Sequence, residues 1–265
     1  MTQEYKHEQV RSRNEAFAQR TATQIWHEQA SIDNPYIAVS ALCHGYDLFE
    51  LMEKRSFVDV FYLLFRGELP SEHESELMQA LMIALINPGP RHPATRAAMN
   101  VGVGKTEPLH ILPIASAVLG GQVSGGGEVE SAMRFLEQHQ ATNIADYFAS
   151  SMHDENNVCG FGRSYGGVDL LAQELAGRLV KYAGAGKALK WGHQLAVSLE
   201  HKGIGWLLTG VAAAALTDLG FQPRAGGCLF QLLGAPGLVA HGLEMAGKPI
   251  LAMPFVSDEN YVIER

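Results

Sequence analysis

Two glycine-rich segments place polar side chains where a ligand could approach the backbone. Gly120–Gly127 holds five glycines around Ser124, and Asn156–Gly167 contains Arg163. A serine hydroxyl can donate a hydrogen bond to a developing oxyanion, and an arginine guanidinium can bind a carboxylate or phosphate with two hydrogen bonds. Glycine lets the backbone come close to a ligand. The alternative is that both segments are plain turns, with Arg163 a surface arginine paired with a nearby acid.

Other kinds of site find little support in the sequence. Cys43, Cys159 and Cys228 are widely spaced and form no C-x-x-C pair, which indicates reduced thiols rather than a disulfide framework or a zinc site. The eleven histidines are scattered without a carboxylate at metal-ligand spacing, so no metal is expected. Gly102–Thr106 looks like the end of a phosphate-binding P-loop, but Met99 stands where the first glycine of that motif belongs.

Composition indicates a soluble protein that binds no nucleic acid. Of the 265 residues, 47% are hydrophobic and 18% charged, and the length allows one or two domains. A net charge of −8 argues against phosphate-backbone binding, which needs a basic face. The uncharged stretch Gly203–Thr217 is too short to span a bilayer, and the charged first twenty residues are no secretory signal. We therefore expect a cytoplasmic protein without a membrane partner.

Apolar periodicity and helix-ending residues predict an all-α chain. Ser71 and Glu74 have the spacing of a capping box at the start of one helix. Met1–Thr23 is expected to be a loosely held arm, and the chain from Pro254 an extended tail. The expected helices are Tyr46–Arg66, Glu72–Ile86, Pro93–Val101, Leu109–Leu119, Glu128–His139, Ile144–His153, Asp169–Tyr182, Lys187–Glu200, Trp206–Leu219, Ala225–Leu233 and Leu238–Ala246.

The segment His44–Ser71 resembles a stretch near the start of the citrate synthase and citryl-CoA lyase superfamily, where the pattern runs R-G-Y-D, then S-F, then Y-L-L-x-x-G-E-L-P. Pro236–Glu244 resembles a later stretch, so the likeness extends from about Ile37 to Tyr261. It implies a citrate synthase-like fold, with a large helical domain (1–143 and 210–265) and a smaller inserted helical domain (144–209). It also implies a two-fold homodimer, for which Leu109–Gly120 is the expected contact helix.

The resemblance also implies which residues form the site, and that its three catalytic side chains are replaced. Ser124 stands where the family has a histidine that hydrogen-bonds the acyl-CoA carbonyl. Arg163 replaces a histidine that polarises the keto acid, and Thr209 replaces the aspartate base. His92 is either a loop histidine or the family's acceptor-binding histidine. Two family arginines that grip carboxylates are replaced by Leu171 and Met253. Backbone contacts to coenzyme A are implied for Gly125, Gly126, Val158, Gly160, Phe161 and Gly162.

The implied activity is carbon–carbon bond formation or cleavage between an acyl-CoA and an oxo acid, or the binding of such ligands. A coenzyme A thioester would be the substrate, and no covalently bound cofactor is expected. Because threonine is no base, Glu128 and Asp169 are the nearest acids that could replace one. The alternative is a non-catalytic subunit that pairs with, or regulates, an active citrate synthase-like paralogue in a heteromer.

Overall fold

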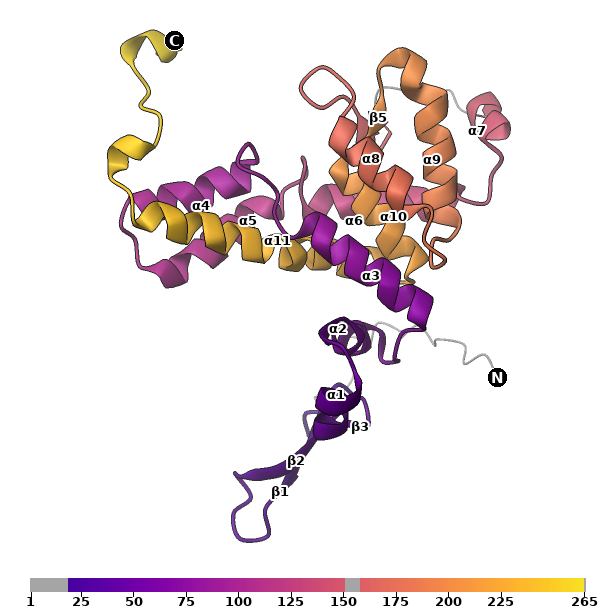
Figure 1. Ribbon diagram of the computed structural model, residues 1–265, viewed down its shortest axis with the longest axis vertical. Coiled ribbons are helices and arrows are strands. Elements are labelled where there is room, and N and C mark those ends of the chain that lie inside the picture. The colour runs from indigo at the N-terminus through magenta and orange to yellow at the C-terminus, as the bar shows by residue number, and fades with distance from the viewer. Residues whose placement is uncertain (1–18, 151–157, 265) are drawn as a thin grey trace. The chain divides into compact units, whose positions relative to one another are not determined.

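The computed structural model describes residues 19–150 and 158–264, and Figure 1 shows its elements. The chain divides into two compact units, Met1–Ser56 and Phe57–Arg265. Part of the predicted arm, residues 1–18, and the end of the helix expected over Ile144–His153 lie outside the described residues. The inserted domain predicted for 144–209 is a finer division of the second unit and stays a prediction.

The first unit contains a small sheet that the sequence analysis did not anticipate. Strands β1 (Trp26–Ala30), β2 (Ala38–Cys43) and β3 (Tyr46–Asp47) pair antiparallel in that order. His44 and Gly45 both have positive φ, as a tight turn between β2 and β3 requires.

The single helix predicted for Tyr46–Arg66 is wrong, because the chain forms two helices there. Asp47 ends β3 and caps α1 (Leu48–Lys54), accepting hydrogen bonds from the amides of Phe49 and Glu50. Arg55 then adopts an extended backbone, and α2 (Phe57–Arg66) begins in the second unit. The strand residues Tyr46 and Asp47 thus delay the start of the predicted helix, and the extended Arg55 divides the rest into two helices.

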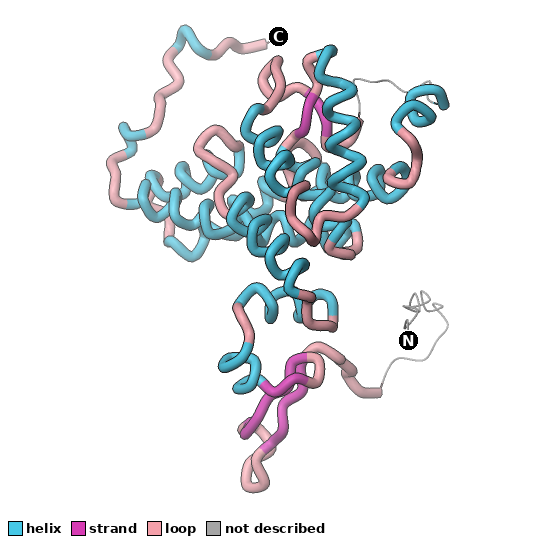
Figure 2. Tube along the Cα trace, turned by 45° about the vertical axis from the view of Figure 1, so that its right-hand side comes forward, coloured by secondary structure: helices cyan, strands magenta, loops and turns pink. Residues whose placement is uncertain are grey.

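The second unit is helical, which confirms the all-α prediction (Figure 2). Its only strands within 57–150 and 158–264 are the two-residue β4 (Phe161–Gly162) and β5 (Gly205–Trp206), which pair antiparallel. After α2, its α-helices are α3 (Glu72–Leu85), α4 (Pro93–Val103), α5 (Ile111–Leu119), α6 (Gly126–His139), α7 (Ile144–Ser150), α8 (Leu170–Leu179), α9 (Lys187–Leu199), α10 (Leu208–Asp218) and α11 (Pro223–Ala246). The tail after Pro254 contains one short 3₁₀ turn, Asp258–Asn260.

The helix α10 lies in the core of this unit. Its residues from Val211 to Leu216 are fully buried, and it packs against α6, α9 and α3. Four consecutive alanines in this stretch, residues 212–215, have short side chains that let neighbouring helices approach closely. Because its whole circumference is covered, α10 is fixed in place, and its first turn offers a well-defined position for a site.

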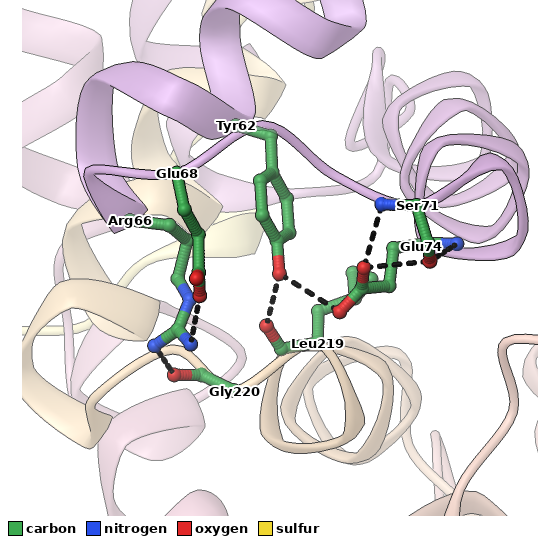
Figure 3. A network of polar contacts seen from close by, with 7 residues as sticks. All are labelled: Tyr62, Arg66, Glu68, Ser71, Glu74, Leu219 and Gly220. Atoms are coloured by element: carbon green, nitrogen blue, oxygen red, sulfur yellow. Dashed lines mark hydrogen bonds and ion pairs between the residues drawn. The ribbon is translucent and has the colours of Figure 1, made fainter. Parts of the chain in front are cut away.

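The end of α10 is held by two side chains of α2, which are supported in turn by residues of the α2–α3 connection and of α3 (Figure 3). The Tyr62 hydroxyl lies 3.2 Å from the carbonyl oxygen of Leu219 and 3.1 Å from a carboxylate oxygen of Glu74. The Arg66 guanidinium donates to the carbonyl oxygen of Gly220. Glu74 also accepts hydrogen bonds from the amide and hydroxyl of Ser71, so the predicted capping box is confirmed. Burial, followed by the nearby Glu74 carboxylate, raises the pKa of Tyr62 to about 12.

The last acid of α10 joins that helix to α9. The Asp218 carboxylate accepts hydrogen bonds from the amides of Gly186, Ala188 and Leu189, at 2.8, 2.8 and 3.0 Å. These amides belong to the first turn of α9, which has no cap of its own. Asp218 therefore works as a cap supplied from another helix.

Two helices predicted between Ala225 and Ala246 are one helix, α11, with Pro236 inside it. Proline lacks an N–H and normally interrupts a helix. Here the neighbouring Gly237 N–H donates to the carbonyl oxygen of Ile86 at 2.9 Å, at the end of α3. By length and composition alone α11 could cross a membrane, but half of its most apolar window is buried against the rest of the unit, as in a core helix.

Candidate functional site

A pocket of about 750 Å³ lies in the second unit, where several connections meet the start of α10. Its walls come from the α3–α4 connection, the loop before α6, the loop before α8, the start of α10 and the middle of α11. Much of the lining is apolar, including Leu119, Leu207 and Phe230. Its polar lining residues are Arg91, His92, Ser124, Ser164, Tyr165, Asp169 and Thr209. An apolar pocket with a few converging polar groups is typical of a small-molecule site.

Ser124 lines this pocket, as its predicted role requires, and its backbone is held from two sides. Its amide donates to a carboxylate oxygen of Glu128 at 2.7 Å, and its carbonyl oxygen lies 2.8 Å from Nε2 of His92. These contacts hold Ser124 at a positive φ of 56°, a conformation that non-glycine residues rarely adopt. The strain favours a fixed position for its exposed hydroxyl at the pocket wall.

His92 is engaged at both ring nitrogens. Nδ1 accepts a hydrogen bond from the amide of Ala94 at 3.1 Å, capping α4. Since Nδ1 accepts, the neutral ring carries its hydrogen on Nε2 and donates it to Ser124. His92 is thus a loop histidine that caps a helix and also lines the pocket, and neither nitrogen is left over as a base.

Thr209 lines the same pocket from the second position of α10. It is only 2% exposed, and its hydroxyl oxygen has no hydrogen-bond partner among the described residues. Two of the three predicted catalytic positions, Ser124 and Thr209, are therefore brought to one cavity. A buried hydroxyl without a partner is uncommon in folded proteins and calls for an explanation.

Arg163 is not among the residues that line the pocket. One of its guanidinium nitrogens donates to the carbonyl oxygen of Lys202 at 2.7 Å, beside Gly203. Arg91 lines the pocket instead and is exposed, with a permanent positive charge. Arg91 was not predicted from sequence, and the only signal that could have found it is its place in the proline-rich loop Asn87–His92.

The glycines expected to approach coenzyme A are required by the packing of the chain itself. A Cβ on Gly126 would lie 2.6 Å from the carbonyl oxygen of Gly227, where α6 crosses α11. Gly160 has a φ of +82°, and a Cβ there would lie 2.7 Å from Cα of Gly210. None of the predicted coenzyme A contacts is among the pocket-lining residues, and their role in binding stays a prediction: Gly125, Gly126, Val158, Gly160, Phe161 and Gly162.

The two acids considered as replacement bases differ in position. Asp169 lines the pocket, and one of its oxygens caps α8 by accepting from the amide of Ala172 at 3.0 Å. Glu128 is not part of the lining and is engaged by the amide of Ser124. Asp169 is therefore the better-placed acid. In the described part of the chain, no group of three His, Cys, Asp or Glu residues could hold a metal ion.

Solved structures of known proteins resemble this chain, whereas comparisons of its sequence found no match. No protein-family model matches the chain, and no curated protein sequence does so. Citryl-CoA lyase from Hydrogenobacter thermophilus superposes with a TM-score of 0.75 at 24% identity, covering 92% of this chain and 94% of that one.

Two further solved structures agree. ATP citrate lyase from Methanosaeta concilii in complex with (3S)-citryl-CoA gives a TM-score of 0.75 at 17% identity, covering 94% of this chain but 42% of the lyase chain. Citrate synthase from Thermotoga maritima MSB8 gives 0.60 at 21% identity, covering 79% of this chain and 60% of the synthase. The chain spans less than half of the ATP citrate lyase chain, and identities this low establish architecture rather than activity. The chain therefore has the fold of the citrate synthase and citryl-CoA lyase superfamily.

Proposed function

We propose that the pocket at the start of α10 binds an acyl-CoA together with an oxo acid or related carboxylate, the ligands of carbon–carbon bond formation or cleavage. The observation that carries this proposal is that Ser124 and Thr209, singled out by sequence alone, line one pocket in a chain with this fold. Two solved structures of the same fold, both ATP citrate lyases, are complexes with (3S)-citryl-CoA and with citrate and coenzyme A.

The pocket is better suited to holding negative charge than to removing a proton. The exposed Ser124 hydroxyl and the buried Thr209 hydroxyl are hydrogen-bond donors, and Arg91 adds a positive charge. Threonine is no base at neutral pH, and both nitrogens of His92 are engaged. Because loss of a general base costs about 10²–10⁴-fold in rate, we expect turnover no higher than about 10⁻³ of an ordinary enzyme of this fold.

Binding and turnover are tested separately. Calorimetric titration with acetyl-CoA, propionyl-CoA and free coenzyme A is expected to give saturable heat with at least one of them. No heat and no thermal shift with any of the three would overturn the binding proposal. An assay with acetyl-CoA and oxaloacetate is expected to show little or no product, and turnover at ordinary rates would overturn the proposed loss of the base.

A second candidate is a non-catalytic subunit that pairs with a related chain, for which the apolar surface of α5 offers a contact. Leu112, Ile114 and Val118 of this helix are exposed in the single chain. A homodimer, or a heteromer with a related chain, would cover this apolar face. This candidate predicts that a paralogue with an intact base co-purifies with the chain under native conditions, and failure to co-purify would count against it.

A further inference from the structure

We propose that one wall of the pocket, formed by the loop before α8 and the first turn of that helix, receives a hydrocarbon side chain of the ligand. The acid bound here is then an oxo acid with one carboxylate and an apolar side chain. This rests on the proposed function for the presence of an oxo acid in the pocket, and it goes further by naming the class of that acid and the residues that select it. A dicarboxylate such as oxaloacetate would be a poor ligand.

Three large apolar side chains of this wall are left mostly uncovered by the described part of the chain. Tyr165, Leu170 and Leu171 line the pocket and are 88%, 78% and 68% exposed, and we call them the apolar wall. A single exposed leucine is ordinary, whereas several apolar side chains at one pocket are typical of a ligand-binding surface. A hydrocarbon group of a ligand would release the water in contact with them, which favours binding.

Packing within the fold does not account for the two leucines of the apolar wall. The side of α8 that is buried in the core carries Ala172, Ala176 and Leu179. Leu170 and Leu171 precede these residues and remain exposed, so the helix would keep its core contacts with polar side chains at both positions. Their apolar character is explained by a ligand in the pocket rather than by the core.

The backbone of Tyr165 gives a second and independent indication. Tyr165 and Gly166 have φ values of 51° and 88°, and they form a tight turn between Ser164 and Gly167, whose amides each donate to the other's carbonyl oxygen at 2.7 and 3.1 Å. A turn with two positive φ values favours glycine, asparagine or aspartate at its first central position. A bulky residue there is strained, and strain of this kind is typical of functional sites. Because the ring is exposed, packing does not compensate for this strain.

The charges of the pocket suit one ligand carboxylate and oppose a second. Among the described lining residues, Arg91 is the one side chain with a permanent positive charge, and a guanidinium can bind one carboxylate with two hydrogen bonds. Asp169 also lines the pocket and directly precedes the two leucines in the chain. Its carboxylate would repel a second ligand carboxylate placed against the apolar wall. An oxo acid with a hydrocarbon side chain avoids this repulsion.

The selectivity of the wild-type chain among three oxo acids tests the inference first. Ketoisocaproate (the oxo acid of leucine), pyruvate and oxaloacetate are titrated calorimetrically, each with and without coenzyme A. Ketoisocaproate exceeds pyruvate only by hydrocarbon, whereas oxaloacetate exceeds it by a carboxylate. We expect ketoisocaproate to bind about tenfold or more tightly than either of the others, the effect of burying a few additional carbon atoms. Equal or tighter binding of oxaloacetate, or no binding of any oxo acid in either condition, would overturn the inference.

Substitution of the two leucines tests the apolar wall itself. Glutamine keeps the helix propensity of leucine and makes the end of the side chain polar, and thermal melting checks that each variant is folded. The control is Leu243→Gln, because Leu243 of α11 is 50% exposed but does not line the pocket. We expect the double variant Leu170→Gln/Leu171→Gln to lose the preference for ketoisocaproate over pyruvate, and Leu243→Gln to keep it. A preference that survives the double variant, or is lost equally in Leu243→Gln, would overturn the wall.

Titrations with acetyl-CoA and octanoyl-CoA separate this inference from the proposed function. If the double variant weakens octanoyl-CoA and leaves ketoisocaproate unchanged, the apolar wall holds the acyl chain of the thioester, and its assignment to the oxo acid is overturned. Acetyl-CoA binding without any preference among the oxo acids would overturn the inference and leave the proposed function standing. Preferred binding of ketoisocaproate that depends on the two leucines, without binding of any coenzyme A compound, would support the inference and overturn the acyl-CoA part of the proposed function.

Discussion

At the scale of single residues, the sequence predicted which residues line the pocket better than it predicted which atoms their side chains contact. Ser124 and Thr209 were found because glycine spacing and the Asp218–Gly220 ending aligned them with a family pattern, and both line the pocket. Arg163 was placed by the same reasoning but donates to a carbonyl outside the pocket lining. Arg163 directly follows β4, which pairs with β5, a segment more than forty residues away in the chain. Such long-range pairing leaves no local signal in sequence.

The Asp169 carboxylate is the best-placed base if the chain has any activity. Asn is as good a helix N-cap as Asp, so Asp169→Asn should keep the cap on α8 while removing the charge. We expect any residual activity to fall about 100-fold or more in Asp169→Asn, with little change in melting temperature. Asp169→Ala should in addition lose about 1 kcal/mol of stability through the missing cap. Unchanged activity in Asp169→Asn would exclude this residue as the base.

A second prediction concerns Glu74 and acid stability. Burial alone would raise the pKa of the Glu74 carboxyl, but hydrogen bonds from the Ser71 hydroxyl and amide and from Tyr62 outweigh burial and leave that pKa below its ordinary value. A carboxyl whose pKa is depressed by folding adds stability above its unfolded pKa, and this stability is lost as the pH falls through the folded pKa.

We therefore expect the free energy of unfolding to decline as the pH falls below about 4.3, the ordinary glutamate pKa. Glu74→Gln should flatten this part of the profile and cost about 1–2 kcal/mol at pH 7, since it weakens the capping box and the Tyr62 contact. Urea unfolding between pH 3 and pH 7 measures both. A Glu74→Gln profile parallel to the wild type would show that Glu74 does not cause the acid sensitivity.

At the scale of elements, most helices could be predicted and their junctions could not. The capping box at Ser71 marked the start of α3 because its signal is local, within four residues. The continuity of α11 could not be foreseen, because the Gly237 amide finds its acceptor at Ile86, about 150 residues earlier in the chain. Proline has no N–H to donate at an interior helix position, yet α11 continues through Pro236, and the amide of the next residue bonds outside the helix.

Gly237 allows α11 and the end of α3 to approach this closely. A Cβ on Gly237 would lie 2.6 Å from Cα of Asn87, a backbone atom that cannot move aside freely. We expect Gly237→Ala to reduce the free energy of unfolding by about 2 kcal/mol or more, through overpacking.

The matched control for this substitution is Gly177→Ala in α8. No atom lies within 4 Å of a Cβ added there, so the added methyl should increase stability by about 0.5–1 kcal/mol, the usual gain in a helix interior. Chemical denaturation of the two variants beside the wild type measures both changes. Equal effects of the two substitutions would contradict the close-approach argument.

At the scale of the whole molecule, the helical fold could be predicted from sequence, but the small sheet inside the first unit could not. One well-matched segment, His44–Ser71, identified an architecture that solved structures share at 17–24% identity. Yet the same segment is divided between the two units at Ser56, and the sheet at Trp26–Asp47 escaped notice. Short strands with exposed side chains lack the buried alternation that marks a strand in sequence.

The assembly of the molecule gives the last prediction. The apolar side chains of α5, including Ile114, are exposed in the single chain, and exposure of this kind is typical of a surface that is covered in an oligomer. We expect a dimer at micromolar concentration by size-exclusion chromatography with light scattering. Ile114→Glu should convert it to a monomer, because a carboxylate without a partner would be buried in the contact. Ile83→Glu, at an exposed position on α3, serves as the control and should leave the dimer intact. A stable wild-type monomer would rule out this contact, and a dimer that survives Ile114→Glu would place it elsewhere on the surface.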